Sequence, residues 1–408
     1  MQETPRDRLL REELADPEKL KGHIARLLGL LTDRLDPSQK CLVYVLAQPS
    51  RIGHLVLEPW MLRTLFGAQY ERIVIVTGPA DEAANGAFFD YLQSEFKIIE
   101  TDDIVLTTLG FVEGGSFSIG NFDFLLWTPQ TLFLTFTKAL ANGAPHRFFA
   151  PGDAWLRPGR QLRSEALAHP EQPYVLLHVR DDTYEPEMGY HAFRCNPVQN
   201  YRDAVLHLLE SDLSVIRIGD PTGPSLDIAH PDYLELSHRP SYDRSADFAL
   251  AAEARFGIVT QSGPWAFLQA LGRPILLTNG YPEPYWAFEE REIGLFKHVL
   301  KADGTALTYR EICALEFGTR ALTNNRLAEH GLTAESNSGA EVLGAVREML
   351  EFLATDVEPD WSAQARLHAI TASFDNSVTG AAAERRATPR LQRRLSRSFL
   401  KANPDFLD

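Results

Sequence analysis

The sequence has 408 residues, of which 44% are hydrophobic and 23% charged, and its formal net charge is -15. This length exceeds what one hydrophobic core usually organises, so we expect two domains. The acidic balance argues against nucleic-acid binding, because a phosphate backbone is bound by a basic surface. No apolar run reaches the ~18 residues of a membrane span, no signal-peptide core is present, and the cysteines lack CxxC spacing. These features predict a reduced, cytoplasmic protein.

The N-terminal part of the sequence predicts a helical extension followed by a Rossmann-like α/β domain. Leucines recur three to four residues apart in residues 1–36, which is typical of amphipathic helices. Within residues 37–160, two continuous apolar runs, 41–47 and 73–77, have the length and composition of buried parallel strands. The first run leads into a loop that carries His54 and precedes a helix-like stretch.

The C-terminal part predicts a second Rossmann-like domain. Residues 144–173 contain five prolines and are the best position for an inter-domain connector. After them, strand-like and helix-like segments alternate over residues 170–355. A helical segment over residues 356–408 is expected to pack back on the N-terminal domain. The expected fold is therefore α/β, with two doubly wound domains that face a cleft and a helical C-terminal segment.

Polar residues follow two of the strands predicted in the second domain. They are Arg180 and Asp181 after residues 174–179, and Gln261, Ser262 and Gly263 after residues 257–260. Ligands bind beyond the carboxyl ends of parallel strands, where a guanidinium and the N–H groups that begin a helix can bind phosphate. Two alternatives remain: Arg180 can pair with its neighbours Asp181 or Asp182, and Ser-Gly also suits any tight turn.

A third strand-like run, residues 214–219, contains Arg217 and ends in Gly219 and Asp220. Because Arg217 is charged within an apolar run, it requires a buried partner. That partner is either a ligand phosphate or an acidic residue of the fold. His178, which shares a strand face with Arg180, is at least as well explained by a structural role as by a chemical one.

His54 is the best candidate for a general base, since an imidazole with a pKa near 6.5 can remove a proton from a sugar hydroxyl at neutral pH. The alternative is a histidine that caps or packs against a helix. The carboxylates of Asp181, Asp182 and Asp153 are the other candidate bases.

The sequence carries no recognisable metal or cofactor motif. It lacks Asp-x-Asp, a cysteine cluster, a Walker loop, a strand-linked GxGxxG and a GxSxG elbow. This argues against the commonest NTPases, dehydrogenases and hydrolases. Metal-independent group transfer remains, in which cationic side chains and a helix N-terminus neutralise a leaving diphosphate. We therefore expect no cofactor and no metal.

A set of motifs in the same order resembles a bacterial family of GT-B-type glycosyltransferases associated with surface-polysaccharide gene clusters. The motifs lie at residues 51–59 (RIGHLVLEP), 177–181 (LHVRD), 215–220 (VIRIGD), 260–263 (TQSG), 277–279 (LTN) and 396–407 (SRSFLKANPDFL). The resemblance implies an N-terminal acceptor lobe with Gly53 and His54, and a C-terminal lobe whose Arg180, Ser262 and Gly263 face a donor diphosphate. One departure concerns Cys195, which separates Arg194 from Asn196 where the family has an Arg-Asn pair.

The leading hypothesis is an inverting, metal-independent transfer of a sugar from a nucleotide-sugar to a glycan or lipid-linked acceptor. It assigns chemistry to His54 and Asp181, and donor binding to Arg180, Arg217, Gly219, Asp220, Gln261, Ser262, Gly263 and Asn279. A nucleotide-sugar epimerase of similar fold is the alternative enzyme, and closure of the cleft by the loop 281–286 would favour it. A docking protein with a degenerate nucleotide site is the non-enzymatic alternative.

The stretch from Arg385 to Lys401 contains seven basic residues and no acidic one. Leucine and phenylalanine recur there at helical spacing, which indicates a basic amphipathic helix. Such a helix either packs on the body of the protein with a solvated basic face, or makes a peripheral contact with the inner membrane.

Overall fold

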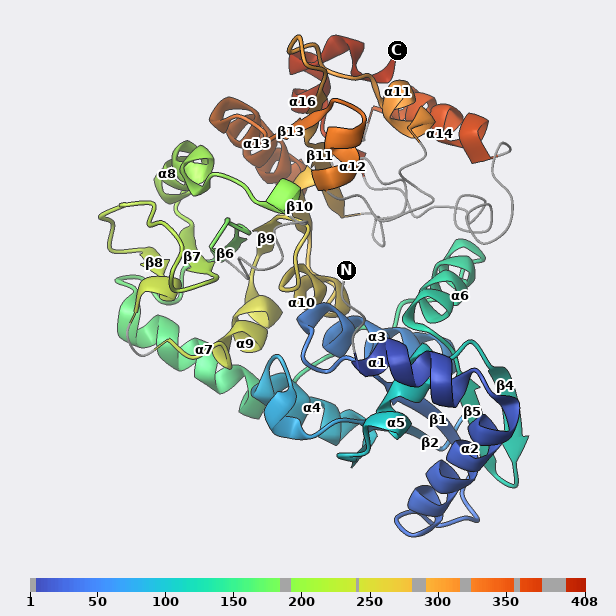
Figure 1. Ribbon diagram of the computed structural model, residues 1–408. Helices are drawn as coiled ribbons and strands as arrows, with labels where there is room; N and C mark the ends of the chain where they lie inside the picture. Colours follow the sequence, from blue (N-terminus) through green and yellow to red (C-terminus); the bar gives the residue numbers. More distant parts are fainter. Residues whose placement is uncertain are drawn as a thin grey trace. The chain divides into compact units, whose positions relative to one another are not determined.

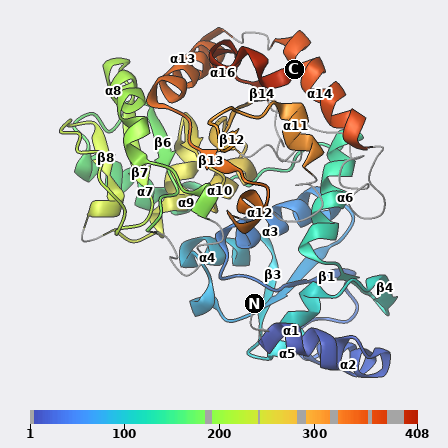
Figure 2. The ribbon, with the colours of Figure 1, turned by 45° about the horizontal axis from the view of Figure 1, so that its top comes forward.

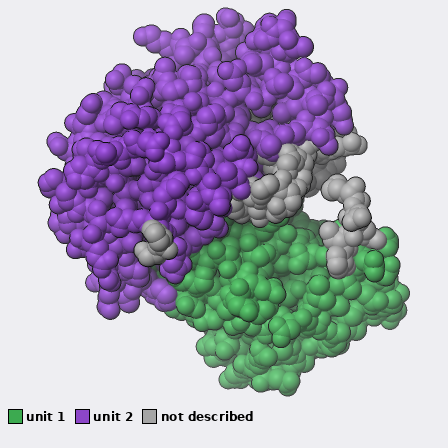
Figure 3. Space-filling view, turned by 60° about the vertical axis from the view of Figure 1, so that its left-hand side comes forward, with its two compact units in different colours: residues 1–151 green, residues 152–408 purple. Residues whose placement is uncertain are grey.

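The computed structural model describes residues 5–183, 192–239, 242–280, 291–315, 324–355, 360–375 and 394–408 (Figure 1). The chain forms two compact units that divide between Pro151 and Gly152, inside the proline-rich stretch predicted to join the domains (Figure 3). Each unit is built around its own sheet. The predicted α/β class with two Rossmann-like units is confirmed.

Unit 1 contains a five-stranded sheet in the order β3-β2-β1-β5-β4, parallel except for the β4–β5 hairpin. Its strands are β1 (Cys41–Leu46), β2 (Arg72–Thr77), β3 (Lys97–Glu100), β4 (Gly115–Ile119) and β5 (Phe122–Leu126). Its helices are α1 (Pro5–Leu9), α2 (Pro17–Thr32), α3 (Ile52–Phe66), α4 (Gly86–Glu95), α5 (Ile104–Thr108) and α6 (Pro129–Ala141), with short turns η1 (Leu10–Leu14), η2 (Ala80–Glu82) and η3 (Leu109–Phe111).

The predicted N-terminal extension is part of the core of unit 1. Asp16 caps α2 by accepting hydrogen bonds from the backbone N–H groups of Glu18 and Lys19. The apolar face of the helix then buries Leu27 and Leu31 in the same cluster as the β1 side chains. Both α1 and α2 contact α5 (Figure 2). The amphipathic spacing read from the sequence therefore marks a face that covers the sheet.

Unit 2 contains a parallel seven-stranded sheet in the order β14-β11-β10-β9-β6-β7-β8. Its strands are β6 (Tyr174–His178), β7 (Ser214–Ile218), β8 (Tyr233–Glu235), β9 (Phe256–Val259), β10 (Ile275–Gly280), β11 (Glu292–Phe296) and β14 (Arg394–Leu395), and a separate antiparallel pair is formed by β12 (His298–Leu300) and β13 (Thr333–Glu335). Its helices are α7 (Asp153–Ala166), α8 (Arg202–Glu210), α9 (Ala246–Glu253), α10 (Trp265–Ala270), α11 (Tyr309–Ala314), α12 (Asn324–Glu329), α13 (Gly339–Thr355), α14 (Trp361–Asp375) and α16 (Arg397–Ala402), with short turns η5 (Val198–Tyr201), η6 (Leu236–His238) and η7 (Pro404–Leu407).

Two segments of unit 2 differ from their sequence-based description. The proline-rich connector contains α7, a 14-residue helix with Pro158 inside it, which packs against α9. The described parts of the C-terminal segment pack within unit 2: α14 contacts α11, β14 pairs with β11, and α16 lies on α13. Packing of that segment on the N-terminal domain stays a prediction.

The basic stretch near the C-terminus is described only from Arg394 onward. The guanidinium of Arg394 lies 4.0 Å from the centroid of the Phe352 ring, and Arg397 pairs with Glu348 and Glu351 on α13. Arg385, Arg386, Arg390 and Arg393 lie outside the described residues. A membrane contact through this stretch stays a prediction.

Among the described helices, none combines the length and the apolar composition needed to cross a membrane.

Each sheet begins at an interior strand and extends in both directions. From β1, the chain of unit 1 adds β2 and β3 on one side and β5 on the other. From β6, the chain of unit 2 adds β7 and β8 on one side, and β9, β10 and β11 on the other. The connections that leave the two central strands of such a sheet diverge, so a crevice opens beyond the carboxyl ends of those strands. These two switch points, β1/β5 and β6/β9, are the expected ligand positions.

A substitution at Gly110 tests the close packing near the end of β1. A Cβ atom at Gly110 would lie 2.4 Å from the carbonyl oxygen of Val45 and 2.9 Å from the Cβ atom of Ala47. We expect Gly110→Ala to lower the free energy of unfolding by about 1–3 kcal/mol, measured by urea denaturation. Gly22→Ala is the control, since an added Cβ there meets nothing within 4 Å and the exposed helix interior favours alanine by about 1 kcal/mol. Equal midpoints for the two variants would contradict the close approach.

Candidate functional site

His54 lies in the first turn of α3, directly after the loop that leaves β1. The helix begins at Ile52, so Gly53 and His54 belong to the helix and not to the predicted loop. The imidazole Nδ1 atom lies 2.5 Å from a carboxylate oxygen of Glu58, one helical turn further on. The His54 side chain is 35% exposed. With Nδ1 directed at Glu58, the Nε2 atom is the nitrogen that is left to meet a substrate.

Glu58 is a buried carboxylate that is held from two sides. Its side chain is 4% exposed, and its second oxygen accepts a 2.5 Å hydrogen bond from the hydroxyl of Tyr44 on β1. Burial and the neighbouring carboxylate hold the pKa of Tyr44 well above its usual range, so this hydroxyl remains a donor. A charge buried in this way requires partners, and Tyr44 and His54 supply one for each oxygen.

Tyr44, Glu58 and His54 form a hydrogen-bonded chain that suits proton removal by the imidazole. A carboxylate that accepts Nδ1–H fixes the neutral imidazole in the tautomer whose Nε2 lone pair is available. When Nε2 takes up a proton, the same carboxylate stabilises the imidazolium. Glu58 was not identified from the sequence. The only available signal was the four-residue spacing between His54 and Glu58 in a stretch that looked helical.

In unit 2, two groups of predicted donor residues, Arg180 and residues 261–263, follow the neighbouring strands β6 and β9. Arg180 follows β6, and its backbone N–H donates to the side-chain oxygen of Thr260, which follows β9, at 3.0 Å. The backbone N–H of Thr260 donates in turn to the carbonyl of His178 at 3.2 Å. Arg180 is thus joined across neighbouring strands to Thr260, the residue that precedes the segment 261–263.

Arg194, which Cys195 separates from Asn196, also contacts the residues that follow β9. Its guanidinium donates a 2.8 Å hydrogen bond to the carbonyl of Gln261. The backbone N–H of Asn196 donates to the carbonyl of Arg180 at 2.9 Å. The loop that contains Cys195 therefore bridges the ends of β6 and β9, and it places the Arg194 guanidinium beside Gln261.

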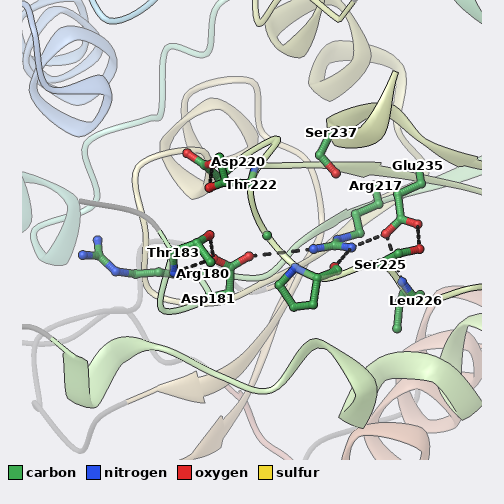
Figure 4. A network of polar contacts seen from close by, with 12 residues as sticks. Arg180, Asp181, Thr183, Arg217, Asp220, Thr222, Ser225, Leu226, Glu235 and Ser237 are labelled. Carbon is green, nitrogen blue, oxygen red and sulfur yellow. Dashed lines mark hydrogen bonds and ion pairs between the residues drawn. The ribbon is translucent and has the colours of Figure 1, made fainter. Parts of the chain in front are cut away.

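Arg217 is engaged with acidic residues of the fold. It is 1% exposed, and its guanidinium contacts Glu235 on β8, lies 3.9 Å from Asp181 and donates to the carbonyl of Pro224 at 2.7 Å. Figure 4 shows the Arg180 side chain directed away from this network. Of the two partners considered for Arg217, a ligand phosphate and an acidic residue, the structure places acidic residues there.

Asp181 is also occupied by local contacts. One carboxylate oxygen accepts hydrogen bonds from the backbone N–H of Thr183, at 3.1 Å, and from its hydroxyl, at 2.5 Å (Figure 4). Close packing of Gly223 limits the space around the other oxygen, since a Cβ atom there would lie 2.2 Å away. Asp181 thus organises a loop, and its role as a base stays a prediction.

Asp220 and Asn279 are tied to neighbouring loops. Asp220 accepts from the backbone and hydroxyl of Thr222, and it lies 3.3 Å from a guanidinium nitrogen of Arg244. Asn279 exchanges two hydrogen bonds with Asn337, and its side-chain amide donates to the Tyr201 hydroxyl at 2.9 Å.

Backbone geometry marks the ends of β7 and β10. Asn279 has φ 54° and Gly219 has φ 152°. Both lie in the region that L side chains rarely adopt, so each strand ends in a conformation that only a few residue types accept. The predicted residues at these two positions therefore shape the edge of the sheet.

His178 is the last residue of β6, two residues before Arg180. Burial, together with the positive charges of Arg217 and Arg180, lowers its pKa to about 3. The imidazole is therefore neutral at physiological pH, and its Nδ1 atom has no hydrogen-bond partner among the described residues. A structural role, the alternative raised from the sequence, fits this environment.

The described residues include no group of three or more His, Cys, Asp or Glu side chains arranged to hold a metal ion. The loop 281–286, which was considered as a cover for a cleft, lies outside the described residues.

Neither a protein-family model nor a curated protein sequence matches the chain. Among solved structures, the chain is similar to a family 9 glycosyltransferase from Veillonella parvula DSM 2008, with 11% identity, a TM-score of 0.49, and coverage of 78% of this chain and 98% of that one. It is also similar to the ADP-heptose lipopolysaccharide heptosyltransferase II of E. coli, with 12% identity, a TM-score of 0.34, and coverage of 58% and 84%. The iron-containing dodecameric glycosyltransferase TibC of E. coli H10407 is 13% identical, with a TM-score of 0.39 and coverage of 78% and 80%.

Because Asp247 on α9 is buried, we expect the stability of the protein to depend on pH. Burial raises the pKa of Asp247 to about 7, although its carboxylate accepts a 2.6 Å hydrogen bond from Tyr242. A carboxyl with a raised folded-state pKa stabilises the protein below its unfolded pKa of about 3.9, and this contribution is lost as the pH rises towards 7. We expect Asp247→Asn to gain stability relative to the unaltered protein between pH 4 and 8, by on the order of 4 kcal/mol.

Urea denaturation at several pH values measures this difference. Asp243→Asn is the matched control, because it changes an exposed carboxylate in the same segment. A constant difference between Asp247→Asn and the unaltered protein across this pH range would show that Asp247 is not protonated in the folded state.

Proposed function

We propose that the protein is a glycosyltransferase that moves a sugar from a nucleotide-sugar donor to a hydroxyl of an acceptor. The observation that carries this proposal is the His54 imidazole, which is backed by the buried carboxylate of Glu58 beyond the end of β1. A partly exposed imidazole held in this way is a general base for a neutral hydroxyl. Unit 1 is accordingly the acceptor side.

The donor edge is assigned to unit 2. Arg180 and the Ser262-Gly263 turn lie beyond the carboxyl ends of β6 and β9, where an open parallel sheet binds nucleotides. Arginine suits a diphosphate because its planar guanidinium donates two parallel hydrogen bonds. Positive charge at that position neutralises the diphosphate as it leaves.

The reaction is a single displacement with inversion. Nε2 of His54 accepts the proton of the acceptor hydroxyl, and the hydroxyl oxygen forms a bond to the anomeric carbon. The bond between that carbon and the phosphate oxygen breaks, and its electron pair leaves with the nucleoside diphosphate. Glu58 stabilises the resulting imidazolium. The step requires no metal ion, and the acceptor belongs to the glycan or lipid-linked precursors of bacterial surface polysaccharides.

Transfer should depend on both members of the His54–Glu58 pair. We expect His54→Ala to lower kcat by about 10²–10⁴-fold, the contribution of a general base, and Glu58→Gln to lower kcat by roughly tenfold or more through loss of the carboxylate. Donor affinity should stay the same in both variants, since the pair lies on the acceptor side. His207→Ala, which changes a histidine on α8, is the control. A normal rate in His54→Ala would place the base elsewhere.

Donor binding should depend on Arg180. We expect one of ADP, UDP, GDP, CDP or dTDP to raise the melting temperature in the presence of EDTA, because a ligand bound only by the folded state stabilises it. Arg180→Ala should weaken this nucleotide by roughly tenfold to hundredfold, the effect of losing a charged hydrogen bond. Arg255→Ala, at an exposed position after α9, is the control. Isothermal titration calorimetry with equal affinities for both variants would remove Arg180 from the donor site.

A further inference from the structure

A buried lysine fixes the loop that carries Arg194. Lys297 follows β11 and is 3% exposed. Its ammonium donates to the carbonyls of Phe193, at 2.6 Å, and Cys195, at 2.8 Å. These two carbonyls belong to the residues on either side of Arg194. The Lys297 side chain therefore binds the loop both before and after this arginine.

The rest of the loop is held as firmly. The side-chain amide of Asn196 donates to the carbonyl of Arg194 at 2.7 Å, so three consecutive carbonyls, from residues 193 to 195, each accept a side-chain hydrogen bond. The amide oxygen of Asn196 accepts from the Ser336 hydroxyl at 3.1 Å. Lys297 is itself anchored, because its backbone N–H donates to the carbonyl of Gly280 at 2.7 Å.

This arrangement is costly for the fold. Burial lowers the pKa of Lys297 to about 8, because removal from water disfavours the charged ammonium. Carbonyl oxygens satisfy an ammonium less well than a carboxylate does, because they carry no opposite net charge. This unfavourable burial occurs at the loop that carries Arg194, at the β6/β9 switch point.

We propose that Arg194 is a second binding residue for a diphosphate at the β6/β9 switch point, and that Lys297 is its positioning residue. The identification of the diphosphate as that of the sugar donor rests on the proposed function. Arg194 is partly exposed, and its contact with Gln261 places it beside the Ser262-Gly263 turn. The backbone N–H of Arg180 bonds to Thr260, and the guanidinium of Arg194 bonds to Gln261. Two arginines therefore lie close to that turn, and two guanidinium groups suit the two phosphates of one ligand.

Inorganic pyrophosphate is the probe, since it carries the proposed group without a base or a sugar. Calorimetric titration in the presence of EDTA compares the unaltered protein with Arg194→Gln, Lys297→Met and the double variant. We expect each single variant to bind pyrophosphate roughly tenfold to hundredfold more weakly, as for a lost charged hydrogen bond. Lys301→Met is the matched control, because Lys301 lies nearby in the sequence but is exposed and pairs with Glu311.

The double variant separates positioning from other effects. If Lys297 acts through Arg194, Lys297→Met should cause little further loss of affinity once Arg194 is glutamine. Independent contributions would instead multiply, and that result would overturn the positioning role. Hydrogen exchange of the backbone amides at residues 194–196 should also quicken in Lys297→Met. Arg194→Gln changes a partly exposed side chain, so it keeps the test available if Lys297→Met does not fold.

Failure of this inference can be told apart from failure of the proposed function. Pyrophosphate binding that depends on Arg194 and Lys297, without binding of any nucleoside diphosphate or sugar transfer, would support the anion site and overturn the glycosyltransferase. Nucleotide binding that Arg194→Gln leaves unchanged would overturn the inference alone. Absence of pyrophosphate binding at millimolar concentration would also overturn it.

Discussion

Both units depend on one constraint of parallel sheets, in which each strand needs a crossover before its neighbour can be added. A sheet that starts from an interior strand must send its crossovers to two sides, and they separate beyond the carboxyl end of that strand. Here the interior strands from which the two sheets start are β1 and β6. The chain places His54 beyond the first and Arg180 beyond the second. The position of each candidate residue therefore follows from the order in which strands are added.

Buried charge then fixes the orientation of these residues. In unit 1, one carboxylate accepts from a strand hydroxyl and faces an imidazole, which connects β1 to α3. In unit 2, Arg217 joins β7 to β8 through Glu235, and Lys297 joins β11 to the loop after β6. An ion that is taken out of water needs well-placed partners, so each pairing permits few local conformations. Pre-organisation of this kind suits a site that must hold reacting groups in place.

The sequence predicted those parts of the fold that depend on local composition. Continuous apolar runs identified β1, β2, β6 and β9, because a strand covered on both faces has no polar side. In contrast, the polar Asp123 interrupts the apolar run of β5, and β14 has only two residues, which is too short for such a run. Neither strand could therefore be recognised in this way.

Partners that are distant in the sequence could not be predicted. Lys297 is 104 residues from Phe193, and nothing in its own neighbourhood indicates that it is buried. Glu58 is different, since its spacing from His54 was visible, and only its contact with Tyr44 needed the fold.

The two units also differ in how their parts are distributed along the chain. Unit 1 is formed entirely from residues 1–151, so it can fold on the ribosome while the remainder is being translated. The sheet of unit 2 includes β14, whose partner β11 precedes it by about a hundred residues. During synthesis, β11 therefore lacks this partner strand until residues 394–408 emerge, and an unpaired strand edge is a place where other strands can add.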